Sequence, residues 1–221
     1  MTPGQVNISM NLLAHFPRIV VATWGRSGSI WLSHDIGAAL NTDPVMQNLT
    51  KVQSFNTADP WPIQTHIIVE PTLLESYSVI FCVRKHSAET VLSSVLARHY
   101  KLWHNMASNP IATPEPFEFT NWQHLESLCH SYVSWHKHYQ SVLEQNCPRY
   151  VVVFEDLLTR RNASKMYLPI YSDKPNYIKN YSQVREFVEL HTDAMQQSTA
   201  PYLDFENSVD IVDVLNSADQ Q

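Results

Sequence analysis

The sequence predicts an α/β fold: an open, P-loop-type parallel sheet with helices on both faces, in three layers. Three observations support this. The expected strands are short and apolar throughout, segments with helical spacing of apolar residues separate them, and two of the four glycines lie in the first strand-to-helix loop. Strands that are apolar on both sides need cover on both faces, and parallel strands need crossover connections, which the helices supply.

The first half of the chain begins with the clearest strand and helix. Residues 18–23 are β-branched and apolar and end at a glycine turn, and residues 29–40 then follow helical spacing. The same patterns predict further elements here: strands at 64–69 and 78–83, a short helical link from about Pro71, and a helix over 87–103.

The second half contains two irregular stretches, at 104–120 and 161–177. The first holds three prolines and little periodicity, as functional loops often do, so we expect it to line a ligand pocket. Regular elements are expected around these stretches: a helix over 121–145 with a core-facing aromatic stripe, a strand at 149–154, and a helix over 182–195.

Length and charge limit the possible classes of protein. With 221 residues, 44% of them hydrophobic, the chain suits a single domain over 1–221, with 1–17 and about 207–221 peripheral. Its formal charge of -6 argues against nucleic acid as a partner, because nucleic-acid binders concentrate positive charge.

The cysteines and the N-terminus bear on the compartment. Cys82, Cys129 and Cys147 lie far apart and form no C-x-x-C pair, so we expect them to be reduced. No basic region followed by an apolar stretch opens the chain, and no stretch approaches the length of a membrane span. We therefore expect a cytoplasmic protein without a membrane span.

The loop after the first strand has the composition of a phosphate cradle. Gly25 and Gly28 let backbone N–H groups turn towards an anion, the following helix adds its positive N-terminal end, and Arg26, Ser27 and Ser29 add side-chain donors. A plain strand-to-helix turn would also use glycine. The sequence lacks G-x-x-x-x-G-K-[ST], which disfavours an ordinary nucleotide triphosphatase or kinase.

The segment T-W-G-R-S-G-S-I-W at 23–31 resembles the 5′-phosphosulfate loop of sulfotransferases that use 3′-phosphoadenosine-5′-phosphosulfate (PAPS), typically T-Y-P-K-S-G-T-T-W. The resemblance implies that Arg26 contacts the phosphosulfate. Gly25 replaces the usual proline and Ile30 a second hydroxyl residue. The residues implied for this part of the PAPS site are Gly25, Arg26, Ser27, Gly28, Ser29, Ile30 and Trp31.

A second segment, at 79–94, is similar to the family's 3′-phosphate motif, in which a strand ending in arginine precedes a helix bearing serine. The resemblance implies Arg84 and Ser93 as phosphate ligands. Lys85 competes with Arg84, since the family's usual spacing pairs Lys85 with Ser93; we prefer Arg84 because a guanidinium binds phosphate in a fork. Alternatively, Arg84 and Lys85 only form ion pairs with Glu89.

Between these segments, Gln64-Thr65-His66 resembles the family's K-T-H, whose histidine is the general base. A side chain with a pKa near 6.5 suits this role at neutral pH, so His66 is the expected base. Glu70 is the alternative, since some members use a carboxylate. Gln64 in place of lysine removes one charge. Two other segments are more weakly similar to motifs of the same family: residues 153–157 to Y-E-D-L, and residues 180–181 to the end of I-x-N-Y.

Together these segments imply transfer of a sulfuryl group from PAPS to a hydroxyl or amine acceptor, without a metal. The family's C-terminal R-K-G is missing, and Arg160, Arg161 or Lys165 are its possible substitutes. A sugar, a phenol or a small alcohol would suit the pocket equally. Two alternatives stay open: a non-catalytic nucleotide-binding protein on the same fold, and a small-molecule kinase that uses ATP and magnesium.

Overall fold

The computed structural model describes residues 18–40, 63–101, 114–144, 148–160 and 173–218, apart from 67, 69 and 76. Four parallel strands form one open sheet in the order β2-β1-β3-β4. The strands are β1 Ile19–Ala22, β2 Ile63–Thr65, β3 Ser78–Val83 and β4 Arg149–Val153. The helices of the described part are α2 Ser29–Leu40, α3 Ser87–Tyr100, α4 Trp122–Leu143, α5 Phe154–Arg160, α6 Tyr181–Glu189, α7 Thr192–Leu203 and α8 Ile211–Ala218, with short 3₁₀ helices η1 Pro71–Leu74 and η2 Lys174–Asn176.

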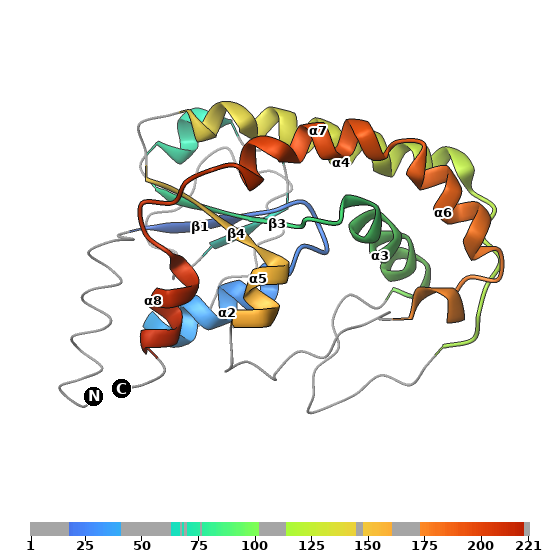
Figure 1. The fold of residues 1–221 in the computed structure, drawn as a ribbon, viewed down its shortest axis with the longest axis horizontal. Coiled ribbons are helices and arrows are strands. Elements are labelled where there is room, and N and C mark those ends of the chain that lie inside the picture. The colour runs from blue at the N-terminus through green and yellow to red at the C-terminus, as the bar shows by residue number, and fades with distance from the viewer. Residues whose placement is uncertain are drawn as a thin grey trace.

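The helices cover both faces of the sheet, which confirms the predicted three-layer α/β fold (Figure 1). Helices α3, α4, α6 and α7 lie on one face, and α2, α5 and α8 lie on the other. Successive strand residues point to opposite faces of the sheet. Val20 and Phe81 belong to the first core, under α3, α4, α6 and α7, while Val21 and Ile80 belong to the second core, under α2, α5 and α8. This period of two explains why the strands are apolar throughout.

The first two elements follow the predicted boundaries closely. Helix α2 begins at Ser29 and ends at Leu40, and β1 occupies the predicted run without its two end residues. The predicted helix over 87–103 ends earlier, at Tyr100, because Lys101 adopts a left-handed conformation with φ 55°. At the start of α4, the side chain of Asn121 accepts a hydrogen bond from the N–H of His124.

Three other predictions differ from the structure. The strand expected at 64–69 is the three-residue β2, and the helix expected over 182–195 is divided into α6 and α7. The predicted peripheral tail after about 207 is wrong, since Ile211, Val212 and Leu215 of α8 are buried in the second core. An apolar face on α8 covers part of α2, which would otherwise be exposed. No helix in the described part of the chain is long and apolar enough to cross a membrane.

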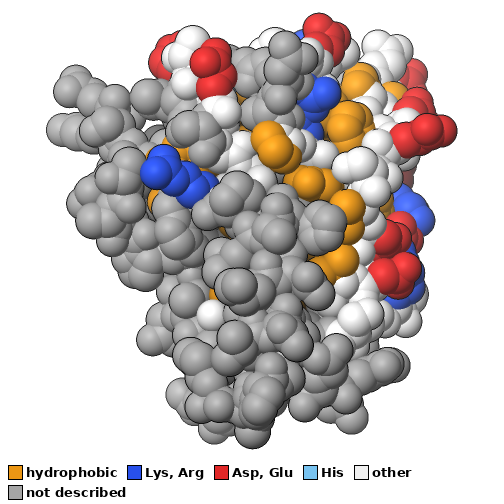
Figure 2. All heavy atoms as spheres, turned by 90° about the vertical axis from the view of Figure 1, so that its left-hand side faces the viewer, with side chains coloured by type: hydrophobic (Ala, Val, Ile, Leu, Met, Phe, Trp, Pro, Cys, Tyr) orange, Lys and Arg blue, Asp and Glu red, His pale blue; other side chains and the backbone are white. Residues whose placement is uncertain are grey.

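The side of the molecule on which α8 lies has a mixed surface. Figure 2 shows that its described hydrophobic side chains gather in one strip beside acidic and basic side chains. The two predicted irregular stretches are described only from residues 114 and 173 onwards. There they pair with each other, because the N–H of Phe117 donates to the carbonyl of Tyr177 and the N–H of Lys179 donates to the carbonyl of Phe117.

Candidate functional site

The candidate site lies where the order of the strands reverses direction. From β1 the chain passes to β2 on one side, and it then returns to β3 on the other side of β1. In open parallel sheets, ligands bind at the carboxyl ends of the two strands that flank such a switch point. The predicted cradle follows β1, Arg84 follows β3, and His66 follows β2. The topology therefore brings the three predicted segments to one edge of the sheet.

The loop between β1 and α2 is fixed to the end of β3. The hydroxyl of Thr23 donates to the carbonyl of Cys82 at 2.8 Å, and the thiol of Cys82 donates to the carbonyl of Ser27. Burial raises the pKa of the Cys82 thiol, so this group stays protonated as a donor. The hydroxyl of Ser27 donates to the carbonyl of Trp24 at 2.9 Å. The loop is thus held in one conformation before any ligand binds.

The two glycines of the loop have different surroundings. Gly28 has φ 81°, and a Cβ there would overlap the ring of Phe154. A Cβ on Gly25 would meet no described atom within 4 Å. Close packing below Gly28 and open space beside Gly25 are the features expected of a cradle for a ligand.

The cradle continues into the first turn of α2, which contains Ser29, Ile30 and Trp31. The first N–H groups of a helix have no acceptor within the helix, and they carry its positive dipole end. The indole of Trp31 packs edge-on against Phe154, with 6.3 Å between ring centroids. The turn therefore offers donors to an anion while its aromatic side chain is held by α5.

Arg26 joins two of the predicted phosphate-binding segments. Its Nε donates to the Oγ of Ser93 at 3.3 Å, so the loop after β1 touches helix α3. Ser93 is buried, with 6% of its surface exposed. A guanidinium and a hydroxyl at this distance offer a charge and a further donor to one anion.

Arg84 and Lys85 are paired with the start of α5, not with Glu89 as the simpler alternative proposes. Arg84 Nε lies 3.4 Å from a carboxylate oxygen of Glu155, and Lys85 Nζ lies 2.8 Å from Asp156. The guanidinium of Arg84 also lies 4.7 Å from the centre of the Phe154 ring. The similarity of segment 153–157 to Y-E-D-L does not by itself indicate these ion pairs.

Glu89 and Arg160 also form ion pairs. Glu89 lies 2.6 Å from Lys174 Nζ, so η2 is tied to the first turn of α3. Arg160, one possible substitute for the missing R-K-G, forms ion pairs with Asp210 and Asp213 at 2.9 and 2.7 Å. Arg161 and Lys165, the other two candidates, lie outside the described residues.

Both ring nitrogens of His66 have partners, Nδ1 in the loop after β1 and Nε2 on β2, although the residue as a whole is exposed. Nδ1 lies 3.2 Å from the carbonyl oxygen of Thr23, and Nε2 lies 2.8 Å from Nε2 of Gln64. Burial of the ring lowers the pKa of His66; the hydrogen bond to Thr23 raises it, and the charge of Arg26 lowers it further. The imidazole is therefore neutral at neutral pH, as a general base must be.

The alternative base, Glu70, is exposed and directly precedes η1. No hydrogen bond or ion pair within the described ranges joins it to the loop. Among the same residues, no group of three or more His, Cys, Asp or Glu side chains is arranged to hold a metal ion. Gln64, by contrast, contacts both Ser29 and His66 through its amide nitrogen. In the sequence, the only indication of its importance is that it replaces the lysine of the K-T-H motif.

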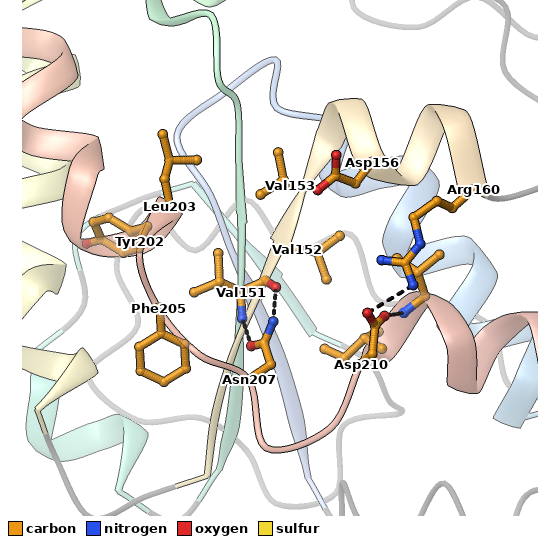
Figure 3. A pocket seen from close by; sticks show the side chains of 12 residues that line it. Val151, Val152, Val153, Asp156, Arg160, Tyr202, Leu203, Phe205, Asn207 and Asp210 are labelled. Carbon is orange, nitrogen blue, oxygen red and sulfur yellow. Dashed lines mark hydrogen bonds and ion pairs between the residues drawn. The ribbon is translucent and has the colours of Figure 1, made fainter.

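A pocket of about 190 Å³ lies elsewhere, beside the edge strand β4 (Figure 3). The polar side chains of Asn207, Arg160 and Asp210 in its lining already have partners within the protein. The side-chain amide of Asn207 accepts from the N–H of Val151 at 2.7 Å and donates to its carbonyl at 2.8 Å. Arg160 is paired with Asp210, as the dashed lines in Figure 3 show. Arg160 is one of the pocket's lining residues, but the predicted cradle, His66, Arg84 and Ser93 are not, so we place the candidate site at the switch point.

Comparison with known proteins gives no family for this chain. No protein-family model matches the sequence, and no significant match was found among curated proteins or solved structures.

Proposed function

We propose that the protein is a sulfotransferase that uses PAPS as the sulfuryl donor and a hydroxyl or amine as the acceptor. The observation that supports it most is the contact between Arg26 and Ser93 at 3.3 Å. These residues belong to two segments that are far apart in the chain and resemble the 5′-phosphosulfate and 3′-phosphate motifs of one family. The topology brings both segments to the switch point, where one ligand with two phosphate groups would contact both.

The residues of the site fit such a donor. The cradle from Gly25 to Ser29 and the first turn of α2 would hold the 5′-phosphosulfate, and Ser93 with Arg84 would hold the 3′-phosphate. When bound, PAPS supplies the sulfuryl group and a phosphate leaving group. The ion pairs of Arg84 with Glu155 and of Lys85 with Asp156 would have to open or share these cations with the 3′-phosphate.

The chain's own groups then have separate tasks. Arg26 and the backbone N–H groups of the cradle stabilise negative charge on the leaving oxygen, and the fixed loop keeps them in place beforehand. His66, neutral and hydrogen-bonded to the same loop, accepts the proton of the acceptor group. The groups that stabilise the leaving oxygen and the group that accepts the proton all lie at the switch point of the sheet.

The first test is calorimetric titration with 3′-phosphoadenosine-5′-phosphate, without metal, on the wild type and on Arg26→Ala and Arg84→Ala. Each variant loses a charged hydrogen-bond donor, so we expect at least about tenfold weaker binding. The control is Arg185→Ala, because Arg185 pairs with Glu189 on the exposed side of α6 and should leave binding unchanged.

Two outcomes would contradict the proposal. Folded wild type that does not bind the nucleotide is one, and binding that neither arginine variant weakens is the other. Binding of ATP that requires magnesium would favour the kinase alternative. If the nucleotide binds, His66→Ala should retain that binding and lower the rate of sulfuryl transfer by about 10²- to 10⁴-fold; binding without transfer to any acceptor would favour the non-catalytic alternative.

A further inference from the structure

The side chain of Gln64 lies between the predicted base and the cradle. Its amide nitrogen is 2.6 Å from Oγ of Ser29 and 2.8 Å from Nε2 of His66. The residue is buried, with 2% of its surface exposed, and its amide oxygen has no hydrogen-bond partner among the described residues. An amide nitrogen carries two hydrogens, so it donates one to each of these neighbours.

These contacts fix the tautomer of His66. Because Gln64 donates to Nε2, that nitrogen carries no hydrogen. Nδ1 lies 3.2 Å from the carbonyl oxygen of Thr23, which only accepts, so Nδ1 carries the hydrogen. His66 is then neutral, as its lowered pKa also requires.

One other arrangement provides a partner for Ser29 and for both ring nitrogens of His66, while the amide N–H groups take the buried place where the oxygen has no partner among the described residues. A rotation of the Gln64 amide by 180° puts its oxygen beside both Ser29 and His66 Nε2. Ser29 must then donate its hydroxyl hydrogen, and Nε2 must carry a hydrogen, while Nδ1 keeps its own for Thr23. In this arrangement His66 is an imidazolium. The two amide orientations thus correspond to the two protonation states.

We infer that Gln64 is a positioning residue whose amide rotates when His66 takes up a proton, which reverses the hydrogen bond between Gln64 and Ser29. The proton forms an N–H bond at the Nε2 lone pair once the Gln64 N–H no longer occupies it, and the group that gives up the proton keeps the electron pair. Before transfer, Ser29 accepts from Gln64 and its own hydrogen is available to the cradle. After transfer, that hydrogen is donated to Gln64, so protonation of the base alters a donor of the cradle.

A lysine, which the resembled motif has at this position, only donates and therefore stabilises only neutral His66. A glutamine has both a donor and an acceptor in one rigid group. Arg26 is the charged group that faces His66 within the described part of the chain, and it opposes the imidazolium. The amide oxygen of Gln64 is then the buried group that compensates for this repulsion.

The test is ¹⁵N NMR of the histidine rings over a pH titration, in the wild type, Gln64→Met and Gln64→Glu. We expect the Nδ1–H tautomer in the wild type at high pH. The hydrogen bond to the imidazolium is charge-assisted and the stronger of the two, so Gln64→Met should lower the pKa of His66. Gln64→Glu places a carboxylate beside the ring and should raise that pKa by about one unit or more. Gln196→Met, on the exposed side of α7, controls for the substitution itself.

If Gln64 were a fixed donor, Gln64→Met would remove a bond to the neutral ring only, and the pKa of His66 would rise. That result, an unchanged pKa in both variants, or an Nε2–H tautomer in the wild type would overturn the inference. The role for Ser29 in the cradle rests on the proposed function, but the titration uses no donor. A failure here is therefore distinct from a failure to bind the nucleotide.

Discussion

Arg26 adopts a backbone conformation that residues with a side chain rarely take, with φ 71°. Such a conformation is unfavourable by roughly 1–2 kcal/mol and persists only where surrounding contacts determine it. Here Nη1 of Arg84 donates to the carbonyl of Arg26 at 3.5 Å, and Nε of Arg26 donates to Ser93. The chain bends at Arg26 so that its guanidinium reaches α3, which is a reason to expect ligand binding at this residue.

Gly28 is the loop position at which an added methyl group should reduce the stability of the fold most. Its φ of 81° disfavours alanine, and the added Cβ would overlap Phe154. We expect Gly28→Ala to lower the free energy of unfolding by about 2–4 kcal/mol, from backbone strain and overpacking together. Gly25→Ala is the matched control and should change stability by less than about 1 kcal/mol, since no described atom lies within 4 Å of its Cβ. Urea unfolding measures both; equal losses would contradict the packing described here.

His136 makes folding sensitive to acid. It is buried with 1% exposure, and burial lowers its pKa from 6.5 to about 4, although a hydrogen bond to the carbonyl of Tyr132 opposes this. The unfolded state binds a proton below pH 6.5 while the folded state does not, so stability falls as the pH drops from 6.5 towards 4. Between pH 7.5 and 5 this one residue should remove roughly 2 kcal/mol.

The check on His136 is urea unfolding of the wild type and His136→Phe at several pH values. The difference between the two proteins isolates this histidine from the others. A difference that does not change with pH would show that His136 is protonated equally in the folded and unfolded states.

Two asparagine side chains complete backbone pairing between elements. Asn207 binds both the N–H and the carbonyl of Val151 on the edge strand β4, and Asn180 binds both groups of Phe119 in the same way. In each case the amide replaces one residue of a neighbouring strand. Asn207 covers an edge that would otherwise be open to another chain. Asn180 holds the end of the first irregular stretch against the start of α6.

Asn207→Ala should lower the free energy of unfolding by about 1–3 kcal/mol, because it leaves both polar groups of the buried Val151 without their partner. Asn216→Ala is the control, since Asn216 donates to the carbonyl of the exposed Arg160, and this variant should lose less than about 1 kcal/mol. Urea unfolding gives the free energies, and faster hydrogen exchange at the N–H of Val151 should accompany the first change alone. If both variants lost the same free energy of unfolding, the pairing of Asn207 with the edge of β4 would not be a special source of stability.

The sequence predicted best those elements whose pattern is local. Residues 29–40 were predicted because a glycine-rich loop precedes a helical apolar pattern, and β3 because six apolar or small residues run together. The break between α6 and α7 has no such signal. Leu190 has φ -60° and ψ -23°, close to helical values, and neither glycine nor proline marks the boundary. A continuous helix was therefore the natural expectation.

At the scale of the whole molecule, sequence order and topology account for much of the candidate site. Segments that each follow a strand must meet at one edge of a parallel sheet, which brings Arg26, His66 and Arg84 together. The partners of the cations were not predictable, because Glu155 and Asp156 lie 71 residues beyond Arg84 and Lys85. The buried position of α8 was missed for a similar reason: its partners on α2 are distant in sequence.

The last prediction concerns the closure of the third layer by α8. Leu215 is 1% exposed in the core that α8 shares with α2, so Leu215→Ala should lower the free energy of unfolding by about 2–5 kcal/mol. Leu190, at the end of α6, is 77% exposed, and the same substitution there should change stability by no more than about 0.5 kcal/mol. Urea unfolding of the two variants compares identical chemical changes. If Leu215→Ala were as mild as Leu190→Ala, α8 would be a peripheral tail, and α2 with the cradle at its start would lack support from that side.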